Sequence, residues 1–416
     1  MLKSRLTVVV LVTMLAGLLC TSAAMGAPTV IKHWYWVPAA DQPAYMEMLD
    51  EFNRTHSDVQ VEWENVPHNE MRRKFITAFT VGAGPDTFVV TSNWIGEFAA
   101  MGMMVPLNDL VGGWDATPDI YENLWENSTI DGKVWGLPWK LLVSYLYYRT
   151  DWFEEAGLTP PVTLYELDEA ARKLVADTDG DGRIDRYGFG LRGGAGGGTM
   201  YYTFMQAWGS KLYDEAGRAA FKTPETIAAT DWYLNLYKDG IAPPSAPGDA
   251  FAEIVAAFKS GQTAMLQHHI GTHVEMDTAL GDKVSAVTIP KGPNDHHYTE
   301  SGLIMHAISA NTNKQEAAWK FISWMSEEWA VRHQAMKLGS VPILKSVGQE
   351  PYFQQNRFFK ASIDGIPVAK PWPTNAGWGY IVDSLTPTLI QQGLMGETTA
   401  EEIVDEIQIA LEEAAE

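Results

Sequence analysis

Segments typical of strands and helices alternate along the first hundred residues, and this order restricts the fold more than any other feature. The five segments span residues 30–36, 41–52, 59–63, 71–79 and 87–91. The first and last are rich in β-branched and aromatic residues, the third alternates apolar and polar side chains, and the other two have apolar residues at helical spacing. Strands joined by helices form a right-handed parallel sheet that binds ligands at the carboxyl ends of its strands. The sequence therefore predicts an α/β fold.

Residues 1–26 have the pattern of an export signal peptide. Lys3 and Arg5 precede an apolar run from Leu6 to Cys20, and small residues follow. As a helix this run would reach only about 22 Å, less than the roughly 30 Å of a bilayer core. We expect an exported protein, in the periplasm or at the extracellular face of the cell membrane. Cys20 leaves a lipid-anchored form open, although Leu19 before it departs from the lipidation pattern.

Size and charge narrow the classes of protein further. Removal of residues 1–26 from the 416-residue chain leaves 390 residues, more than one hydrophobic core usually organises, so two lobes are expected. The net charge of −22 repels phosphate backbones and anionic lipid heads, which excludes nucleic acid as a partner. We expect a monomer.

The order of segments also predicts how the two lobes are built. We assign residues 27–140 and 301–345 to an N-terminal lobe, and residues 141–300 and 346–416 to a C-terminal lobe. The sequence has no long disordered linker. The lobes should therefore be joined by short crossing strands and should close like a hinge.

Five short motifs occur in order along the chain. They are Trp34–Trp36, Ala83–Asp86 with Asn93-Trp94, residues 135–139 followed by 146–151, residues 258–265, and residues 317–322 followed by 339–342. Together they resemble the family of extracellular solute-binding proteins that includes the maltose-binding protein. The resemblance implies a two-lobed periplasmic-binding-protein fold with crossing hinge strands. It also implies the substrate-binding subunit of an ABC importer, which delivers a sugar or oligosaccharide to membrane subunits, catalyses nothing and requires no cofactor.

The aromatic content fits a sugar ligand. The chain has 16 Trp, 16 Tyr and 15 Phe, more than its core needs. A pyranose has apolar faces and a girdle of hydroxyls, so its site combines aromatic platforms with polar groups. The predicted ligand-binding residues are Trp36, Asn93, Trp94, Trp139, Trp208, His269, Trp372 and Trp378. Ordinary packing is the alternative interpretation of each Trp, and His269 stands where the family often has a stacking Trp.

A loop rich in Asp follows the pattern of an EF-hand. Positions 1, 3, 5 and 9 are Asp177, Asp179, Asp181 and Asp185. Gly182 stands at position 6, where the turn is sharp, but position 12 is Gly188 in place of the bidentate Glu. We predict a structural Ca²⁺ here, with a simple turn as the alternative.

Two other ligand classes and one enzyme class remain open. Arg192 and Lys140 would suit an anionic solute such as a glycerol-phosphate, whereas several converging carboxylates would suit a polyamine. A secreted glycosidase is defined by the spatial separation of two carboxylates and not by a motif, so the sequence does not exclude it.

Overall fold

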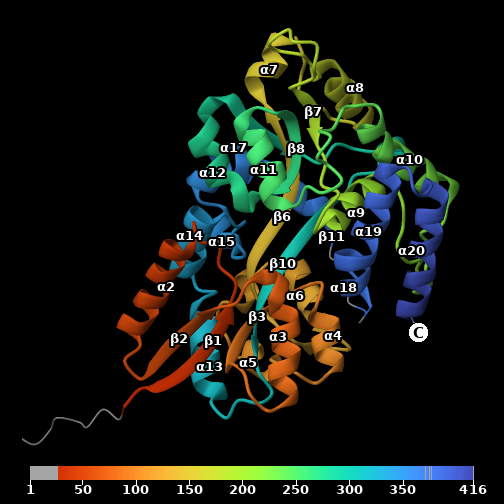
Figure 1. Ribbon diagram of the computed structural model, residues 1–416. Coiled ribbons are helices and arrows are strands. Elements are labelled where there is room, and N and C mark those ends of the chain that lie inside the picture. The colour runs from red at the N-terminus through yellow and green to blue at the C-terminus, as the bar shows by residue number, and fades with distance from the viewer. Residues whose placement is uncertain (1–26, 371, 374, 376, 416) are drawn as a thin grey trace, which may run out of the picture.

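The computed structural model describes residues 27–415 except residues 371, 374 and 376 (Figure 1). The predicted export signal, with Cys20, lies outside the described residues. Within the described part of the chain, no helix has the length and apolar character needed to span a bilayer.

Nine strands of the described chain form one mixed sheet. Its main path runs β2-β1-β3-β10-β6-β8-β7, with β11 paired to β10 and β9 paired to β6. The strands are β1 (Thr29–Tyr35), β2 (Val59–Asn65), β3 (Thr87–Thr91), β6 (Leu137–Arg149), β7 (Tyr187–Gly190), β8 (Thr263–His269), β9 (Val284–Thr288), β10 (Thr299–Ile308) and β11 (Ala369–Lys370). A separate hairpin pairs β4 (Thr129–Ile130) with β5 (Lys133–Val134). As predicted, β1 is parallel to both β2 and β3.

Two long strands connect the two halves of the sheet. Residues 137–143 of β6 pair with β10, and residues 144–149 pair with β8 and β9. The far end of β10 pairs with β3. Figure 1 shows β6 and β10 side by side, with β1 to β3 at one end and β7 and β8 at the other. We call the part around β1 to β3 the first lobe and the part around β7 to β9 the second lobe; their boundary residues stay a prediction.

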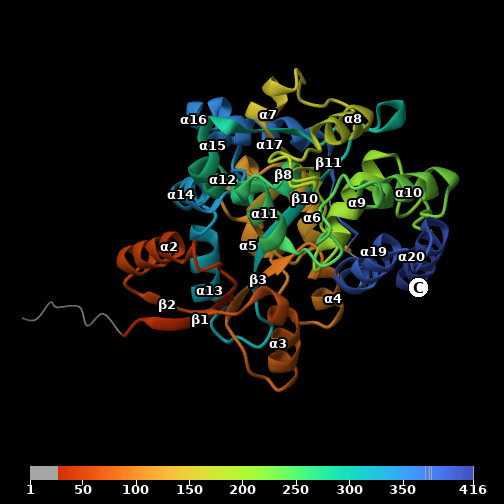
Figure 2. The same cartoon turned by 45° about the horizontal axis from the view of Figure 1, so that its top comes forward.

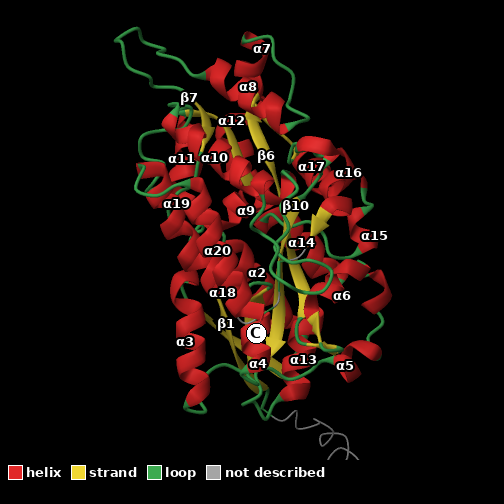
Figure 3. Cartoon of the chain, turned by 90° about the vertical axis from the view of Figure 1, so that its right-hand side faces the viewer, coloured by secondary structure: helices red, strands yellow, loops and turns green. Residues whose placement is uncertain are grey.

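Helices cover both lobes. Those of the first lobe are α2 (Gln42–Thr55), α3 (His68–Thr80), α4 (Ile95–Ala100), α5 (Asn108–Gly112), α6 (Glu122–Ser128), α13 (Gln315–Trp324) and α14 (Glu328–Leu338), and α15 (Lys345–Gly348) follows where the chain returns to the second lobe. Those of the second lobe are α7 (Thr150–Glu155), α8 (Leu164–Leu174), α9 (Gly197–Ala207), α10 (Pro224–Lys238), α11 (Phe251–Ser260), α12 (His273–Leu280), α16 (Pro351–Gln355), α17 (Arg357–Gly365), α18 (Trp378–Tyr380), α19 (Thr386–Met395) and α20 (Ala400–Ala415). Figures 2 and 3 show them flanking the central strands, with α19 and α20 beside α10.

Two apolar clusters hold this arrangement together. One lies in the first lobe, where Tyr45 and Phe52 of α2 and Phe321 of α13 pack on one face of the sheet. The other begins on the opposite face of the first lobe, follows the crossing strands and fills the second lobe. Because the crossing strands belong to this continuous core, their side chains are held in fixed positions at the junction of the lobes.

Candidate functional site

A cavity of about 480 Å³ lies between the lobes, against the crossing strands. Its floor includes Lys140 and Leu142 of β6, and Glu300 and Gly302 of β10. The first lobe contributes Tyr35, Trp36, Pro38, Asp41, His68, Thr91, Ser92 and Asn93, and the second lobe contributes Arg192, Gly196, Thr199, Phe251, His269, Gly271, Trp372 and Asp383. Its volume is that of a small-molecule site, and a molecule inside it would contact both lobes.

Four of the predicted ligand-binding residues line this cavity: Trp36, Asn93, His269 and Trp372. Trp36 follows β1 and is half-buried. Its ring lies 5.7 Å from the ring of Trp94 and 4.8 Å from that of His68. Trp94 is only 3% exposed and stacks on His68, so it supports Trp36 without lining the cavity. These contacts fix the orientation of the Trp36 ring.

The other three predicted platforms lie elsewhere, which corrects the sequence-based assignment. Trp139 is 0% exposed. Side chains alternate between the two faces of a strand, and since Lys140 and Leu142 face the cavity, Trp139 faces the core of the first lobe. Trp378 is buried behind Trp372, with the two rings 5.4 Å apart. Trp208 packs on Tyr165 and Trp232 outside the cavity.

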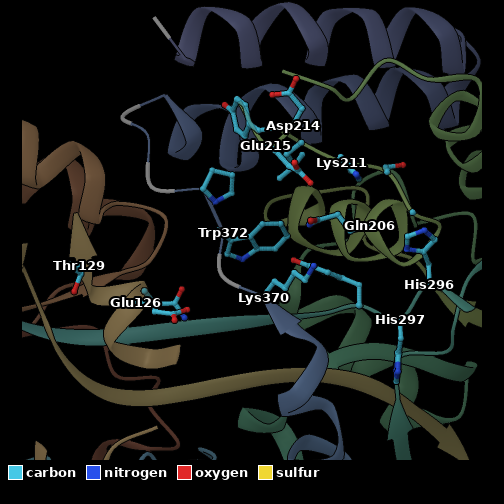
Figure 4. A pocket seen from close by; sticks show the side chains of 17 residues that line it. Glu126, Thr129, Gln206, Lys211, Asp214, Glu215, His296, His297, Lys370 and Trp372 are labelled. Carbon is cyan, nitrogen blue, oxygen red and sulfur yellow. The ribbon is translucent and has the colours of Figure 1, made fainter. Parts of the chain in front are cut away.

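A wider hollow of about 630 Å³ also lies between the lobes (Figure 4). Its walls include Glu126 and Thr129 of the first lobe, with Lys211 and His296 of the second. Trp372 lines both the hollow and the cavity. We assign the ligand site to the smaller cavity because both crossing strands form its floor and Trp36, Asn93 and His269 line it.

Glu300 is the most unusual side chain of the cavity. It is 4% exposed, and Ser144 Oγ donates a hydrogen bond to its Oε1 at 3.2 Å. Its Oε2 has no hydrogen-bond partner among the described residues, since the nearby Thr203 hydroxyl donates to the carbonyl of Thr199. Burial raises the pKa of Glu300 from 4.5 to about 8. At neutral pH this carboxyl group is therefore mainly protonated, and it can donate as well as accept a hydrogen bond.

Burial shifts the pKa of other groups at the site in the direction of their neutral forms. It lowers the pKa of Lys140 to about 8, an effect that the charge of Asp41 partly opposes, and Lys140 Nζ donates to the carbonyl of Leu338 at 2.9 Å. It also lowers the pKa of His268 to about 3 and that of His269 below its usual range. The backbone N–H of Gly271 donates to Nδ1 of His269. The imidazole of His269 is therefore neutral and carries its proton on Nε2, where it can donate to a ligand.

Sequence reasoning missed several residues of the cavity, namely Asp41, His68, Phe251, Glu300 and Asp383. One of them had a usable signal. Glu300 is the only charged residue of the otherwise apolar or uncharged segment Thr299–Ile308. A charge at such a position is retained only where it has a partner or a function. The others lie in loops and helices, where no local pattern distinguishes them.

The Asp-rich loop lies away from this cavity, and its geometry partly fits a cation. One carboxylate oxygen each from Asp177, Asp179 and Asp181 lies within 4.8 Å of the other two. Asp185, the fourth predicted ligand, accepts hydrogen bonds from the backbone N–H and the hydroxyl of Thr178. Gly188 at position 12 lies in β7 and offers no carboxylate. Three ligands fit, and the calcium site stays a prediction.

We expect added Ca²⁺ to raise the melting temperature and a chelator to lower it again, because a cation relieves repulsion among the three carboxylates. Asp179→Asn should remove this response. Asp282→Asn, at an exposed Asp outside the loop, should keep it. Melting curves with and without calcium provide the measurement. If neither calcium nor the chelator changes the melting temperature, the loop is a simple turn without a bound cation.

Known proteins share both the sequence pattern and this two-lobed arrangement. A putative binding protein of Brucella abortus is 25% identical over 360 residues, 85% of each chain. The mannitol-binding protein of Pseudomonas aeruginosa is 26% identical over 343 residues, 77% of each chain. An ABC transporter solute-binding protein of Thermotoga lettingae, solved with α-D-tagatose, superposes with a TM-score of 0.84 at 23% identity, over 93% of this chain and 100% of that chain.

The superposition confirms the predicted two-lobed α/β fold with crossing strands. The family model described as bacterial extracellular solute-binding protein matches residues 37–330. These residues include both crossing strands and most of the residues that line the cavity. Because the match spans more than half of the chain, the protein belongs to the bacterial extracellular solute-binding protein family.

Proposed function

We propose that this protein is the substrate-binding subunit of an ABC importer and captures a sugar or a related polyol in the cavity between its lobes. The observation that carries the proposal is the cavity itself, which both lobes line and whose floor the crossing strands form. Trp36 and Trp372 offer aromatic faces, and Asp41, Asn93 and Asp383 offer acceptors for hydroxyl groups. Relatives named for mannitol and solved with tagatose support the same ligand class.

Ligand capture is coupled to closure of the lobes in this proposal. A ligand that contacts both lobes binds their closed arrangement more tightly, and this differential affinity shifts the population. The lobes already approach at Gly379 of α18, where an added Cβ would lie 3.3 Å from the carbonyl oxygen of Asn93. The membrane subunits would then recognise the closed form. Export to the periplasm or the cell surface follows from the family and from the signal pattern of residues 1–26.

A thermal-shift screen against sugars and polyols tests the proposal. A ligand at 100 times its dissociation constant should add about 2.7 kcal/mol to stability. The bound ligand is then recovered and analysed, and we expect it to be chemically unchanged. A product formed over repeated turnovers would favour the glycosidase alternative, and a panel without any stabilising member would contradict the proposed function.

Trp36→Ala should weaken ligand affinity about threefold or more, because stacking on an aromatic ring contributes roughly 0.5 to 1.5 kcal/mol beyond area burial. Isothermal titration calorimetry with a ligand from the screen provides the measurement. Trp208→Ala is the matched control, since this Trp is also half-buried but lies outside the cavity. Equal losses in the two variants, or no loss in Trp36→Ala, would place the ligand elsewhere.

A further inference from the structure

Arg192 lines the cavity and forms no ion pair with any carboxylate of the described residues. No carboxylate oxygen of the described residues lies within 4.0 Å of its guanidinium, whereas eight other arginines form such a pair. Its Nε donates to the carbonyl of Ala195 at 2.7 Å. An ideal Cβ at Gly196 would lie 2.0 Å from Nη2, so the guanidinium packs directly on the Gly196 backbone. These contacts hold the side chain in place and leave its two Nη groups without a carboxylate partner.

A small chamber adjoins the cavity next to this guanidinium. Its volume is about 20 Å³, and Arg192, Thr199, His269 and Glu300 line both spaces. About 10 to 15 Å³ of such volume holds one water molecule, so the chamber has room for one oxygen-sized atom. The chamber therefore suits a single terminal group of a ligand that lies in the cavity.

The groups around the chamber favour a negative charge in it. Glu300 is protonated at neutral pH, and its buried Oε2 lacks a partner among the described residues. His268 and His269 are neutral, and the Nε2–H of His269 can donate a hydrogen bond to an anion. Helix α9 begins at Gly197, beside the chamber, and the N-terminus of a helix carries a partial positive charge. The other carboxyl groups of the cavity, Asp41 and Asp383, do not line the chamber.

We propose that the ligand is a sugar acid whose carboxylate binds Arg192 and Glu300 at this chamber. One carboxylate oxygen would enter the chamber, and the hydroxyl groups would lie in the cavity near Asn93 and Asp383. A planar guanidinium matches the two oxygens of a carboxylate, and Arg192 is half-buried and forms no ion pair with a carboxylate of the described residues. A carboxylate that places one oxygen in the chamber has one oxygen left for the guanidinium, whereas a phosphate has two further oxygens to accommodate outside the chamber. This inference rests on the proposed function and deepens it by naming the substrate class.

Compounds paired so that each acid differs from its neutral counterpart only at one terminal carbon test the inference: gluconate is compared with sorbitol, and glucuronate with glucose. Glucose, sorbitol, gluconate, glucuronate and glucose 6-phosphate, with the corresponding galactose series, are titrated into the mature protein by calorimetry. We expect an acid to bind at least tenfold more tightly than its neutral counterpart. Arg192→Gln should remove this preference, Arg192→Lys should restore part of it, and Arg73→Gln, at an exposed Arg outside the cavity, should leave it unchanged.

The outcomes separate the inference from the proposed function. If neutral sugars bind as tightly as the acids, or Arg192→Gln weakens both equally, the sugar-acid inference is overturned and the proposed function stands. Preference for the phosphate over the acids also overturns it. If no compound binds, both proposals fail. The ratio of acid to neutral affinity in the wild-type protein decides the question even if Arg192→Gln does not fold.

Discussion

Trp139→Ala should lower the free energy of unfolding by about 3 to 5 kcal/mol, the range for truncation of a fully buried aromatic side chain. The Trp139 ring is enclosed in the first lobe, 4.4 Å from the ring of His306 and 5.0 Å from that of Tyr35. The side-chain amide of Gln334, with its oxygen toward the indole, accepts a hydrogen bond from Nε1 at 2.9 Å. Truncation would therefore leave a cavity and an unpaired amide.

Urea denaturation measures this loss, and Trp329→Ala is the control. Trp329 is 42% exposed on α14, so its truncation should have a much smaller effect. Ligand affinity of Trp139→Ala at low temperature should stay close to that of the wild-type protein, because the ring does not line the cavity. If Trp139→Ala folds stably but no longer binds the ligand, Trp139 belongs to the binding site after all.

Glu300 alone should lower the stability of the ligand-free protein as pH rises from about 4.5 to about 8, by an amount on the order of a few kcal/mol. The folded state raises the pKa of Glu300 to about 8 from the usual 4.5. In this interval the folded protein keeps a proton that the unfolded chain releases, so a higher pH favours unfolding. The contribution is fully present below about pH 4.5 and is lost above about pH 8.

Glu300→Gln isolates this effect because it keeps the shape of the side chain and cannot ionise. The variant should gain stability relative to the wild-type protein between pH 5 and pH 8, as measured by urea denaturation at each pH. Buried histidines such as His268 act in the opposite direction between about pH 3 and pH 6.5, since their folded pKa is lowered. These histidines are present in both the wild-type protein and the variant, so their contributions cancel when the two free energies of unfolding are subtracted. A difference that does not change with pH would show that Glu300 is ionised in the folded state.

The aromatic content of the sequence suggested that the ligand is recognised mainly by stacking on Trp side chains. The residues that line the cavity indicate a larger role for polar groups. Of six predicted Trp platforms, only Trp36 and Trp372 line it. Many of the other side chains that line the cavity are polar. Two of them, Arg192 and Glu300, also line the small chamber beside it. Recognition by hydrogen bonds and charge gives stronger discrimination between similar solutes than stacking does, because a wrong partner leaves buried polar groups unpaired.

Local patterns in the sequence were sufficient to predict the architecture. The predicted strand at residues 87–91 has the same bounds as β3, and the predicted helices at residues 41–52 and 71–79 correspond to α2 and α3. Hydrophobic periodicity and turn residues act over a few positions, so the sequence displays them directly. The order of these elements then determined the parallel arrangement of β1, β2 and β3.

The site itself was decided by contacts between distant residues. Ser144 and Glu300 are 156 positions apart, and they meet only because β6 and β10 pair where the chain crosses between the lobes. Strand alternation predicts that Trp139 and Lys140 face opposite sides, but only the packing of α13 and α14 on one side makes that side core and the other side cavity. The sequence thus determined the elements and their order, and the tertiary structure decided which side chains share the cavity, because burial and long-range register arise only when the lobes are assembled.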